Sequence, residues 1–267
     1  MAPKRMTAPA ITAMKKSGDK VVALTAYDRV TATIIDEAGV DLILVGDSAA
    51  MVVLGYENTL PVTLDEMLML TAAVARADTR ALVVGDMPFM SYQASVSDAV
   101  RNAGRFVKEG GAGAVKLEGG KKVVPKVGAV LEAGIPVMGH IGLTPQSIHE
   151  LGGYRVQGKD ETARRMLVDD AVALSEAGCF AIVLEAMPAE LGREITEAVD
   201  VPTIGIGAGP RCDGQVLVIS DIVGMTAGRV PKFVRRYGDV RSVLSEAARA
   251  YVRDVRSGDY PGEDESY

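Results

Sequence analysis

Short apolar segments that end in a carboxylate recur along this chain of 267 residues. The first reads D-L-I-L-V-G-D-S over residues 41–48, and three later ones end at Asp86, Glu118 and Glu185. Segments of this length and composition are typical of buried parallel strands. The carboxyl ends of such strands share one rim of an α/β barrel, where active sites are built. The pattern therefore predicts four carboxylates around one cavity: Asp47, Asp86, Glu118 and Glu185.

Helical segments separate the apolar segments in regular alternation. Strands are expected at residues 21–25, 42–45, 82–84, 114–117, 136–139, 180–184, 202–206 and 216–219. Strand and helix in repeated succession indicate parallel pairing with right-handed crossovers. Eight repeats in this length predict an α/β fold of the (β/α)8 TIM barrel type, although an open doubly wound sheet would show the same alternation.

The domain organisation is expected to be simple. No linker rich in Pro, Gly or Ser divides the sequence, so we expect a single barrel domain over residues 1–267. Residues 1–18 contain four basic and no acidic side chains and predict an exposed helical arm. Apolar residues at helical spacing from 240 to 251 predict a C-terminal helix, and the polar residues 258–267 a frayed tail.

Composition and charge exclude several classes of function. The net charge of −6 and the pI near 5.1 argue against nucleic acids and against anionic membranes. No apolar segment reaches the length of a membrane span. The two cysteines form no C-x-x-C pair, which suits a reducing cytoplasm rather than a disulfide framework. Cys179 is expected to be buried and Cys212 to lie half-exposed in a loop.

Three of the carboxylates follow consecutive strands, which favours a metal site. Asp47, Asp86 and Glu118 would supply the hard oxygen ligands that Mg²⁺ prefers. Zinc prefers His and Cys, of which the chain has two each. The alternative is that each carboxylate caps the following helix or pairs with a surface arginine.

A lysine inside a strand marks a second kind of candidate. Lys116 lies two positions before Glu118, so both side chains point to the same face of the strand. A lysine among apolar residues is costly unless it faces a charge, and near carboxylates it would bind an anionic substrate group. The alternative is a side chain that extends outward to solvent.

Two further strand ends carry groups that can transfer protons. Glu185 stands apart from the metal group, and its apolar neighbours favour the protonated form, which suits a general base. Its alternative is a helix-capping role. His140 follows the fifth strand, and its alternative is a buried structural imidazole. Residues 205–209, G-I-G-A-G, predict a tight turn that lets the backbone pass close to a ligand.

Several motifs occur together in one order. They are V-G-D-S at 45–48, G-D-M-P-F at 85–89, V-K-L-E-G-G at 115–120, G-H-I-G-L-T-P-Q at 139–146, G-G-Y at 152–154, I-G-I-G-A-G at 204–209, D-G-Q-V-L-V at 213–218 and P-K-F at 231–233. This combination resembles the ketopantoate hydroxymethyltransferase family from about residue 11 to about residue 256.

The resemblance implies a specific chemistry. It implies a barrel of the phosphoenolpyruvate/pyruvate type that transfers a hydroxymethyl group from 5,10-methylenetetrahydrofolate to 3-methyl-2-oxobutanoate. The products would be 2-dehydropantoate and tetrahydrofolate, in pantothenate synthesis. It further implies one Mg²⁺ per subunit, a cytoplasmic homodecamer and small-molecule partners, with no nucleic acid and no membrane.

Matching positions carry over the family's residue roles. The metal acids fall on Asp47, Asp86 and Glu118, and the base falls on Glu185. The keto-acid contacts fall on Asp47, Ser48, Asp86 and Lys116. His140 matches a pocket histidine near the transferred one-carbon unit. A turn or helix cap is the alternative for Ser48.

Two other functions remain possible at this point. One is a Mg²⁺-dependent carbon–carbon lyase of the same barrel class, which a nucleophilic cysteine after a strand would favour. The other is a metabolite sensor on a barrel scaffold, which loss of the carboxylates would favour. Neither feature is found in the sequence.

Overall fold

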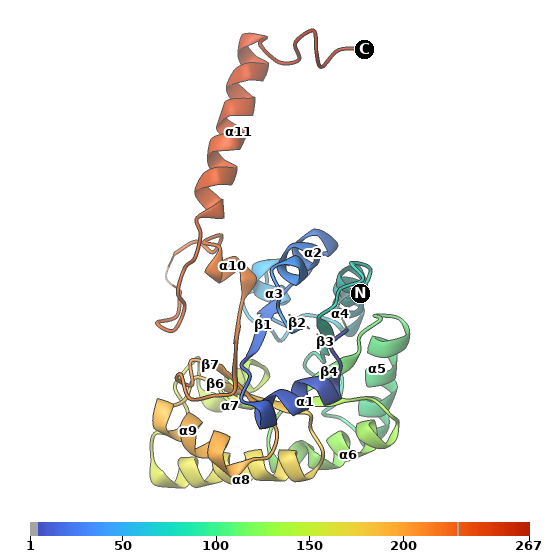
Figure 1. The fold of residues 1–267 in the computed structure, drawn as a ribbon, viewed down its shortest axis with the longest axis vertical. Helices are drawn as coiled ribbons and strands as arrows, with labels where there is room; N and C mark the ends of the chain where they lie inside the picture. The colour runs from blue at the N-terminus through green and yellow to red at the C-terminus, as the bar shows by residue number, and fades with distance from the viewer. Residues whose placement is uncertain (1–4, 229) are drawn as a thin grey trace. The chain divides into compact units, whose positions relative to one another are not determined.

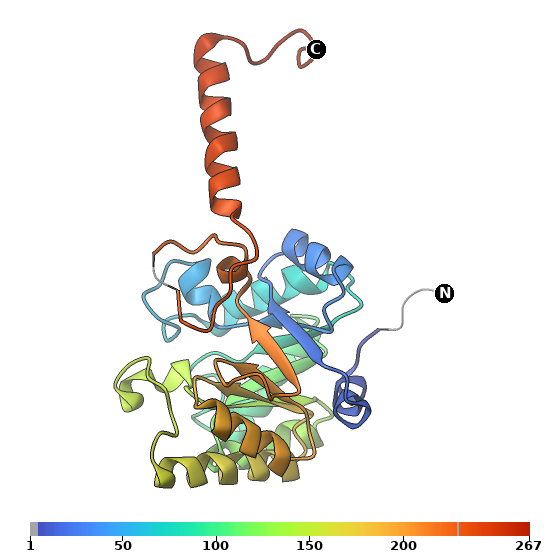
Figure 2. The ribbon, with the colours of Figure 1, turned by 60° about the vertical axis from the view of Figure 1, so that its left-hand side comes forward.

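Eight parallel strands close into a barrel in the computed structural model of the chain, which describes residues 5–228 and 230–267 (Figure 1). The strands are β1 (Val21–Thr25), β2 (Leu42–Val45), β3 (Leu82–Asp86), β4 (Ala114–Glu118), β5 (Val137–Gly142), β6 (Ala181–Glu185), β7 (Thr203–Ile206) and β8 (Gly214–Leu217). Figure 2 shows β8 beside β1, where parallel pairing closes the ring. The prediction of a (β/α)8 barrel is confirmed, and the open sheet is excluded.

Helices follow the strands and lie outside the ring (Figure 1). The longer ones are α2 (Arg29–Glu37), α4 (Leu64–Ala75), α5 (Val96–Lys108), α6 (Val124–Glu132), α8 (Glu161–Glu176) and α9 (Ala189–Ala198). Short helical segments are α3 (Ala49–Val52), η1 (Lys121–Val123), η2 (Pro145–Ser147) and α7 (Ile148–Leu151). A capping box begins α4, with Thr63 and Glu66 each accepting from the other's backbone N–H.

The first helix, α1 (Ala8–Ser17), covers the amino-terminal end of the barrel. Ile11 is fully buried against core residues at the starts of several strands, and Thr12 donates to the carbonyl of Phe180 at 3.0 Å. Lys15 Nζ donates to Thr196 O and pairs with Asp213, both at 2.8 Å. The helix expected in the arm of residues 1–18 is present, but it packs on the barrel, so its described residues are only partly exposed. Residues 1–4 of that arm lie outside the described residues.

Two details near the last strand differ from expectation. β8 spans Gly214–Leu217 rather than the expected residues 216–219, and it approaches β1 so closely that a Cβ at Gly214 would lie 2.4 Å from Val21 O. Cys212 is buried at 1% exposure rather than half-exposed, since its loop packs beneath β7. Cys179 is buried, as predicted.

The chain forms two compact units, residues 1–218 with the barrel and residues 219–267. The second contains α10 (Ile219–Ile222) and the predicted C-terminal helix, α11 (Val240–Ser257), which Asp239 caps by accepting from Ser242 N–H. No described helix combines the length and hydropathy of a membrane span. The expectation that residues 1–267 form a single domain stays a prediction. The same holds for the expectation that residues 258–267 are frayed.

Candidate active site

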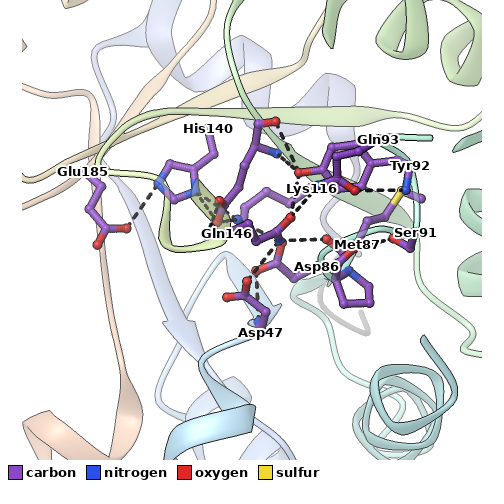
Figure 3. A network of polar contacts seen from close by, with 12 residues as sticks. Asp47, Asp86, Met87, Ser91, Tyr92, Gln93, Lys116, His140, Gln146 and Glu185 are labelled. Atoms are coloured by element: carbon purple, nitrogen blue, oxygen red, sulfur yellow. Dashed lines mark hydrogen bonds and ion pairs between the residues drawn. The ribbon is translucent and has the colours of Figure 1, made fainter. Parts of the chain in front are cut away.

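The predicted site residues meet at the carboxyl ends of the strands. Asp86, Glu118 and Glu185 are the last residues of β3, β4 and β6, and Asp47 lies two positions beyond β2. Strand register places Lys116 beside Asp86 and His140 beside Glu118. The rim expected from the sequence therefore gathers these side chains in one network (Figure 3).

Lys116 is the cation at the centre of this network. Its Nζ lies 2.9 Å from Asp86 Oδ1 and 3.5 Å from Glu118 Oε1. Its side chain is only 3% exposed, so the outward-pointing alternative is wrong. Burial lowers the pKa of Lys116, but the charges of Asp86 and Glu118 outweigh it and raise that pKa above its usual value. Lys116 is a permanently charged group that faces the cavity side of β4.

Each of three carboxylates is anchored through one oxygen by an N–H donor. Asp86 Oδ2 accepts from the backbone N–H of Asp47, and Glu118 Oε2 accepts from the backbone N–H of Gln146, both at 3.0 Å. Asp47 Oδ2 accepts from the Gln146 side chain at 3.0 Å. The second oxygens of Asp86 and Glu118 face Lys116, and among the described residues none donates a hydrogen bond to Asp47 Oδ1.

The crowded carboxylates carry more negative charge than Lys116 neutralises. Burial, and then repulsion from Asp86 and Glu118, raise the pKa of Asp47 well above its usual value. Burial likewise raises the pKa of Asp86 despite the neighbouring Lys116. Burial also acts to raise the pKa of Glu118, but the charge of Lys116 and the hydrogen bond from His140 hold it below its usual value. An additional cation would relieve the repulsion at Asp47 and Asp86.

The donor set fits a hard divalent cation. Asp47, Asp86 and Glu118 are each no more than 5% exposed and offer oxygen donors only. Among the described residues, no three His, Cys, Asp or Glu side chains lie close enough together to form a metal cluster. The reason at this site is that Lys116 lies between Asp86 and Glu118. The negative charge that Lys116 leaves unneutralised nevertheless suits a divalent cation, and so do the hydrogen bonds that hold one oxygen of each acid. Such a cation would displace protons from the acids when it binds.

His140 connects this network to Glu185. His140 Nδ1 lies 3.0 Å from Lys116 Nζ and 3.3 Å from Glu118 Oε1, and its Nε2 lies 3.2 Å from Glu185 Oε2. Burial and Lys116 lower the pKa of His140, but hydrogen bonds to Glu118 and Glu185 outweigh both and raise it to about 9. If His140 is protonated, both ring nitrogens carry a proton. If it is neutral and Nδ1 accepts from Lys116, the proton is on Nε2. In both states Nε2 carries a proton and faces Glu185.

Glu185 is separate from the three anchored acids, as the sequence suggested. Its side chain is 17% exposed, the most accessible carboxylate of the network, and its contact in the network is His140. Ala186, directly after it, has a φ of 47°, in the left-handed region that L residues rarely adopt. Such local strain is common where a side chain is held for function.

Ser48 lies beside the metal candidates but does not act as a helix cap. Its side chain makes no capping hydrogen bond to α3, and its Oγ lies 2.9 Å from the hydroxyl of Tyr27. A turn or cap role is therefore wrong for the side chain. Ser48 places a hydroxyl next to Asp47 at the rim.

The glycine-rich turn at residues 205–209 serves packing. A Cβ at Gly209 would lie 2.5 Å from the Ala189 Cβ, and the carbonyl of Ala208 would lie 2.2 Å from a Cβ at Gly192. The close approach is thus between this turn and α9. The expectation that the turn also passes close to a ligand stays a prediction.

Sequence reasoning gave no role to two polar residues that complete the network. Gln146 and Tyr92 are buried, and Figure 3 shows them in contact between the loops after β3 and β5. Glutamine and tyrosine in loops carry no local signal of burial, so only the fold shows their place. A cavity of ≈ 710 Å³ borders this pair and is lined further by Glu118, Lys122 and Lys126.

Comparison with known proteins identifies the family of this chain. The model of the ketopantoate hydroxymethyltransferase family matches residues 5–263. The chain belongs to the ketopantoate hydroxymethyltransferase family. It is therefore an enzyme, a transferase of hydroxymethyl groups.

Curated relatives agree with this assignment to the ketopantoate hydroxymethyltransferase family. A protein of Trichlorobacter lovleyi named 3-methyl-2-oxobutanoate hydroxymethyltransferase is 56% identical over 99% of both chains. A protein of the same name from Carboxydothermus hydrogenoformans is 56% identical over 98% of this chain and 95% of its own.

Two solved structures have folds similar to that of this family member. A phosphonopyruvate hydrolase in complex with oxalate and Mg²⁺ superposes with a TM-score of 0.63 at 14% identity, covering 97% of this chain and 93% of that one. A 2,3-dimethylmalate lyase of the PEP mutase/isocitrate lyase superfamily gives 0.62 at 17% identity, covering 99% and 93%. These likenesses show the barrel fold that the sequence predicted.

Proposed function

We propose that this enzyme transfers a hydroxymethyl group from 5,10-methylenetetrahydrofolate to 3-methyl-2-oxobutanoate, with water, giving 2-dehydropantoate and tetrahydrofolate in pantothenate synthesis. The observation that carries the proposal is the near full-length identity of 56% to enzymes named for this keto acid. The buried cation and acids of the rim supply the chemistry that a 2-oxo acid needs. The adjoining cavity of ≈ 710 Å³ offers room for a larger second substrate.

The proposed metal is Mg²⁺, one per subunit, held by Asp47, Asp86 and Glu118. Support comes from the oxygen-only donor set and from the negative charge that Lys116 leaves unneutralised. When bound there, the ion would supply a Lewis acid for the negative charge that develops on the keto oxygen. The Mg²⁺ in the phosphonopyruvate hydrolase structure belongs to that protein and is consistent with a divalent metal in this barrel type.

Residues of the chain orient the keto acid in this proposal. Lys116 and Ser48 hold the substrate carboxylate, the first through its charge and the second through its hydroxyl or backbone N–H. Asp47 and Asp86 border the same position at the rim. Glu185 removes the proton from C3, because it is the accessible carboxylate of the network and is free of Lys116.

The proton movement follows from the placement of Glu185 and His140. In this proposal the folate opens to an iminium, water adds to its methylene carbon, and the bond from that carbon to the folate nitrogen breaks, which releases tetrahydrofolate and formaldehyde. The enolate carbon left by Glu185 attacks the formaldehyde carbon, and the new alkoxide takes up the proton that Glu185 removed. His140, whose Nε2 lies 3.2 Å from Glu185 Oε2, holds that carboxylate in position near the transferred one-carbon unit.

The rival lyase function is disfavoured by the cysteines. Cys179 and Cys212 are each 1% exposed, and burial raises the pKa of both thiols, that of Cys179 to about 12. A buried, protonated thiol is a poor nucleophile. The sensor alternative is excluded by the family assignment.

We also propose that the enzyme assembles as a homodecamer in the cytoplasm. The α11 helix supports self-association, because five of its apolar side chains are exposed, although the ring of Tyr251 contacts Tyr260 in the same unit. The five are Val243, Leu244, Tyr251, Val252 and Val255. Light scattering on the purified chain would give the number of subunits.

Product formation tests the function directly. The purified enzyme is mixed with 3-methyl-2-oxobutanoate, methylenetetrahydrofolate and Mg²⁺, and 2-dehydropantoate is measured by mass spectrometry. Product that requires both substrates and disappears with EDTA supports the proposal. Absence of product from the folded wild-type enzyme under these conditions would overturn it.

A further inference from the structure

Gln146 is the most completely bonded side chain of the rim. Its Nε2 donates to Asp47 Oδ2 and to the carbonyl of Met87, both at 3.0 Å. Its Oε1 accepts from the Tyr92 hydroxyl at 2.8 Å and from Gln93 Nε2 at 3.0 Å. The residue is only 5% exposed. A carboxamide has two donor hydrogens and two acceptor positions, and here all four are used.

These four contacts fix the orientation of the amide. The donors Tyr92 and Gln93 approach one end, and the acceptors Asp47 and Met87 approach the other. A flipped amide would direct its oxygen at a carboxylate and a carbonyl, and its NH₂ at another amide donor. Burial removes water as a substitute partner, so the flipped state is costly. The N–H that reaches Asp47 is therefore held in one direction.

The same residue contacts a second acid through its backbone. The backbone N–H of Gln146 donates to Glu118 Oε2 at 3.0 Å. Its side chain holds Asp47 Oδ2, a contact that Figure 3 shows. Asp47 follows β2 and Glu118 ends β4, so Gln146 spans two acids from non-adjacent strands. Its position in η2, directly after Pro145, keeps backbone and side chain in fixed relation.

Tyr92 supports Gln146 from the loop after β3. The Tyr92 hydroxyl accepts from the backbone N–H of Glu118 at 3.0 Å. Its single hydrogen has two acceptors within reach, Gln146 Oε1 at 2.8 Å and Glu118 O at 3.2 Å. The shorter contact favours Gln146. One hydroxyl thus connects the anchored amide to the strand that carries Glu118.

We propose that Gln146 is a positioning residue for the divalent cation, a role that rests on the proposed metal site. By holding Asp47 Oδ2, the amide fixes the carboxylate plane and leaves Oδ1 for the ion. Hydrogen bonds to outer oxygens of ligating carboxylates set the direction of the inner ones, and their loss typically weakens metal binding about 10- to 100-fold. The backbone contact to Glu118 remains in any side-chain variant, so substitution tests the Asp47 contact.

The test is a calorimetric titration of the whole enzyme with Mg²⁺. Gln146→Met keeps the length of the side chain but cannot donate, and Gln146→Asn keeps the amide but is too short for all four contacts. We expect Kd for Mg²⁺ to rise about 10- to 100-fold in each variant that folds, as judged by its thermal unfolding midpoint. Gln93→Met is the matched control, because it removes one donor to Oε1 and leaves the Asp47 contact. Its Kd should stay within about 3-fold of wild type.

A double variant separates positioning from general loosening. Once Asp47→Ala has removed the carboxylate, adding Gln146→Met should weaken Mg²⁺ binding by no more than about 2-fold further. Unchanged Mg²⁺ affinity in folded Gln146 variants, an equal loss in Gln93→Met, or additive losses in the double variant would each overturn the positioning role. If wild-type enzyme itself binds no Mg²⁺, the proposed metal site fails, and the positioning role with it.

Discussion

Replacing Lys116 by Met is the change whose effect the structure defines best. Methionine has nearly the same length, so packing is retained while the charge is lost. The change leaves Asp86 and Glu118, 2.9 and 3.5 Å from the missing ammonium group, without their shared cation in a buried setting. Removing one partner of a buried ion pair typically costs about 3–5 kcal/mol of unfolding free energy, because the remaining charge is buried without compensation.

An exposed lysine provides the matched control. Lys121 Nζ lies 2.9 Å from Asp169, the same distance as Lys116 from Asp86, but these side chains are 58% and 63% exposed. Surface ion pairs contribute about 0–1 kcal/mol. Lys121→Met should therefore cost at least about 2 kcal/mol less than Lys116→Met, because Lys116 is buried and is shared by two acids.

Urea unfolding at one fixed protein concentration measures both variants. EDTA is present throughout, so that no divalent ion replaces the lost charge, and the midpoint and slope of each transition give the free energy. Equal costs for the two substitutions would refute the reasoning. Lys116 would then not be the buried counter-ion of the network.

Three further changes test other parts of the site. Glu185→Gln should slow exchange of the C3 proton of the keto acid with D₂O by about 10²–10⁴-fold while keto-acid binding persists, and normal exchange by NMR would exclude Glu185 as the base. Asp86→Ala should weaken Mg²⁺ and keto-acid binding together in calorimetry, and an unchanged Mg²⁺ affinity would show that the ligand set is wrong. Gly142→Ala should destabilise by about 1–2 kcal/mol at its φ of 97°. Its new Cβ would lie 2.2 Å from Glu185 O, and displacing this base by about 1 Å should lower kcat about 100-fold. Gly128→Ala, in α6 with nothing within 4 Å of the new Cβ, should keep wild-type kcat and raise stability by up to about 1 kcal/mol.

The barrel could be predicted because its signals are local. Each strand is a short apolar segment, and each ends near a residue that the pattern places on the carboxyl rim. Burial on both faces of a parallel sheet makes such segments continuous, so Asp86, Glu118 and Glu185 were found from spacing alone. Lys116 was found because a lysine is almost never buried in such a segment unless an opposite charge pairs with it.

The polar partners of these acids could not be predicted in the same way. Gln146 reaches Asp47 across 99 positions of sequence, and no periodicity relates the two. The same holds for α1, whose basic residues suggested an exposed arm. The partners of Lys15, which are Asp213 and the carbonyl of Thr196, lie about 180 or more positions away. The residue pattern within one strand or helix indicates which side chains are buried. It does not indicate which side chains of different elements pair, because those pairs follow from the closed barrel.

The long sequence separations within the network have a consequence for folding. Asp47 and Asp86 lie 39 positions apart, Lys116 and His140 lie 24 apart, and Gln146 closes the group 99 positions after Asp47. Contacts of such range form late, because the intervening chain must first lose its freedom. A growing chain that ends before β5 therefore has Asp47, Asp86, Lys116 and Glu118 but lacks His140 and Gln146. Capture of the proposed Mg²⁺ would then report that this half of the barrel has finished folding, and the ion would favour the completed barrel over its partly folded precursors.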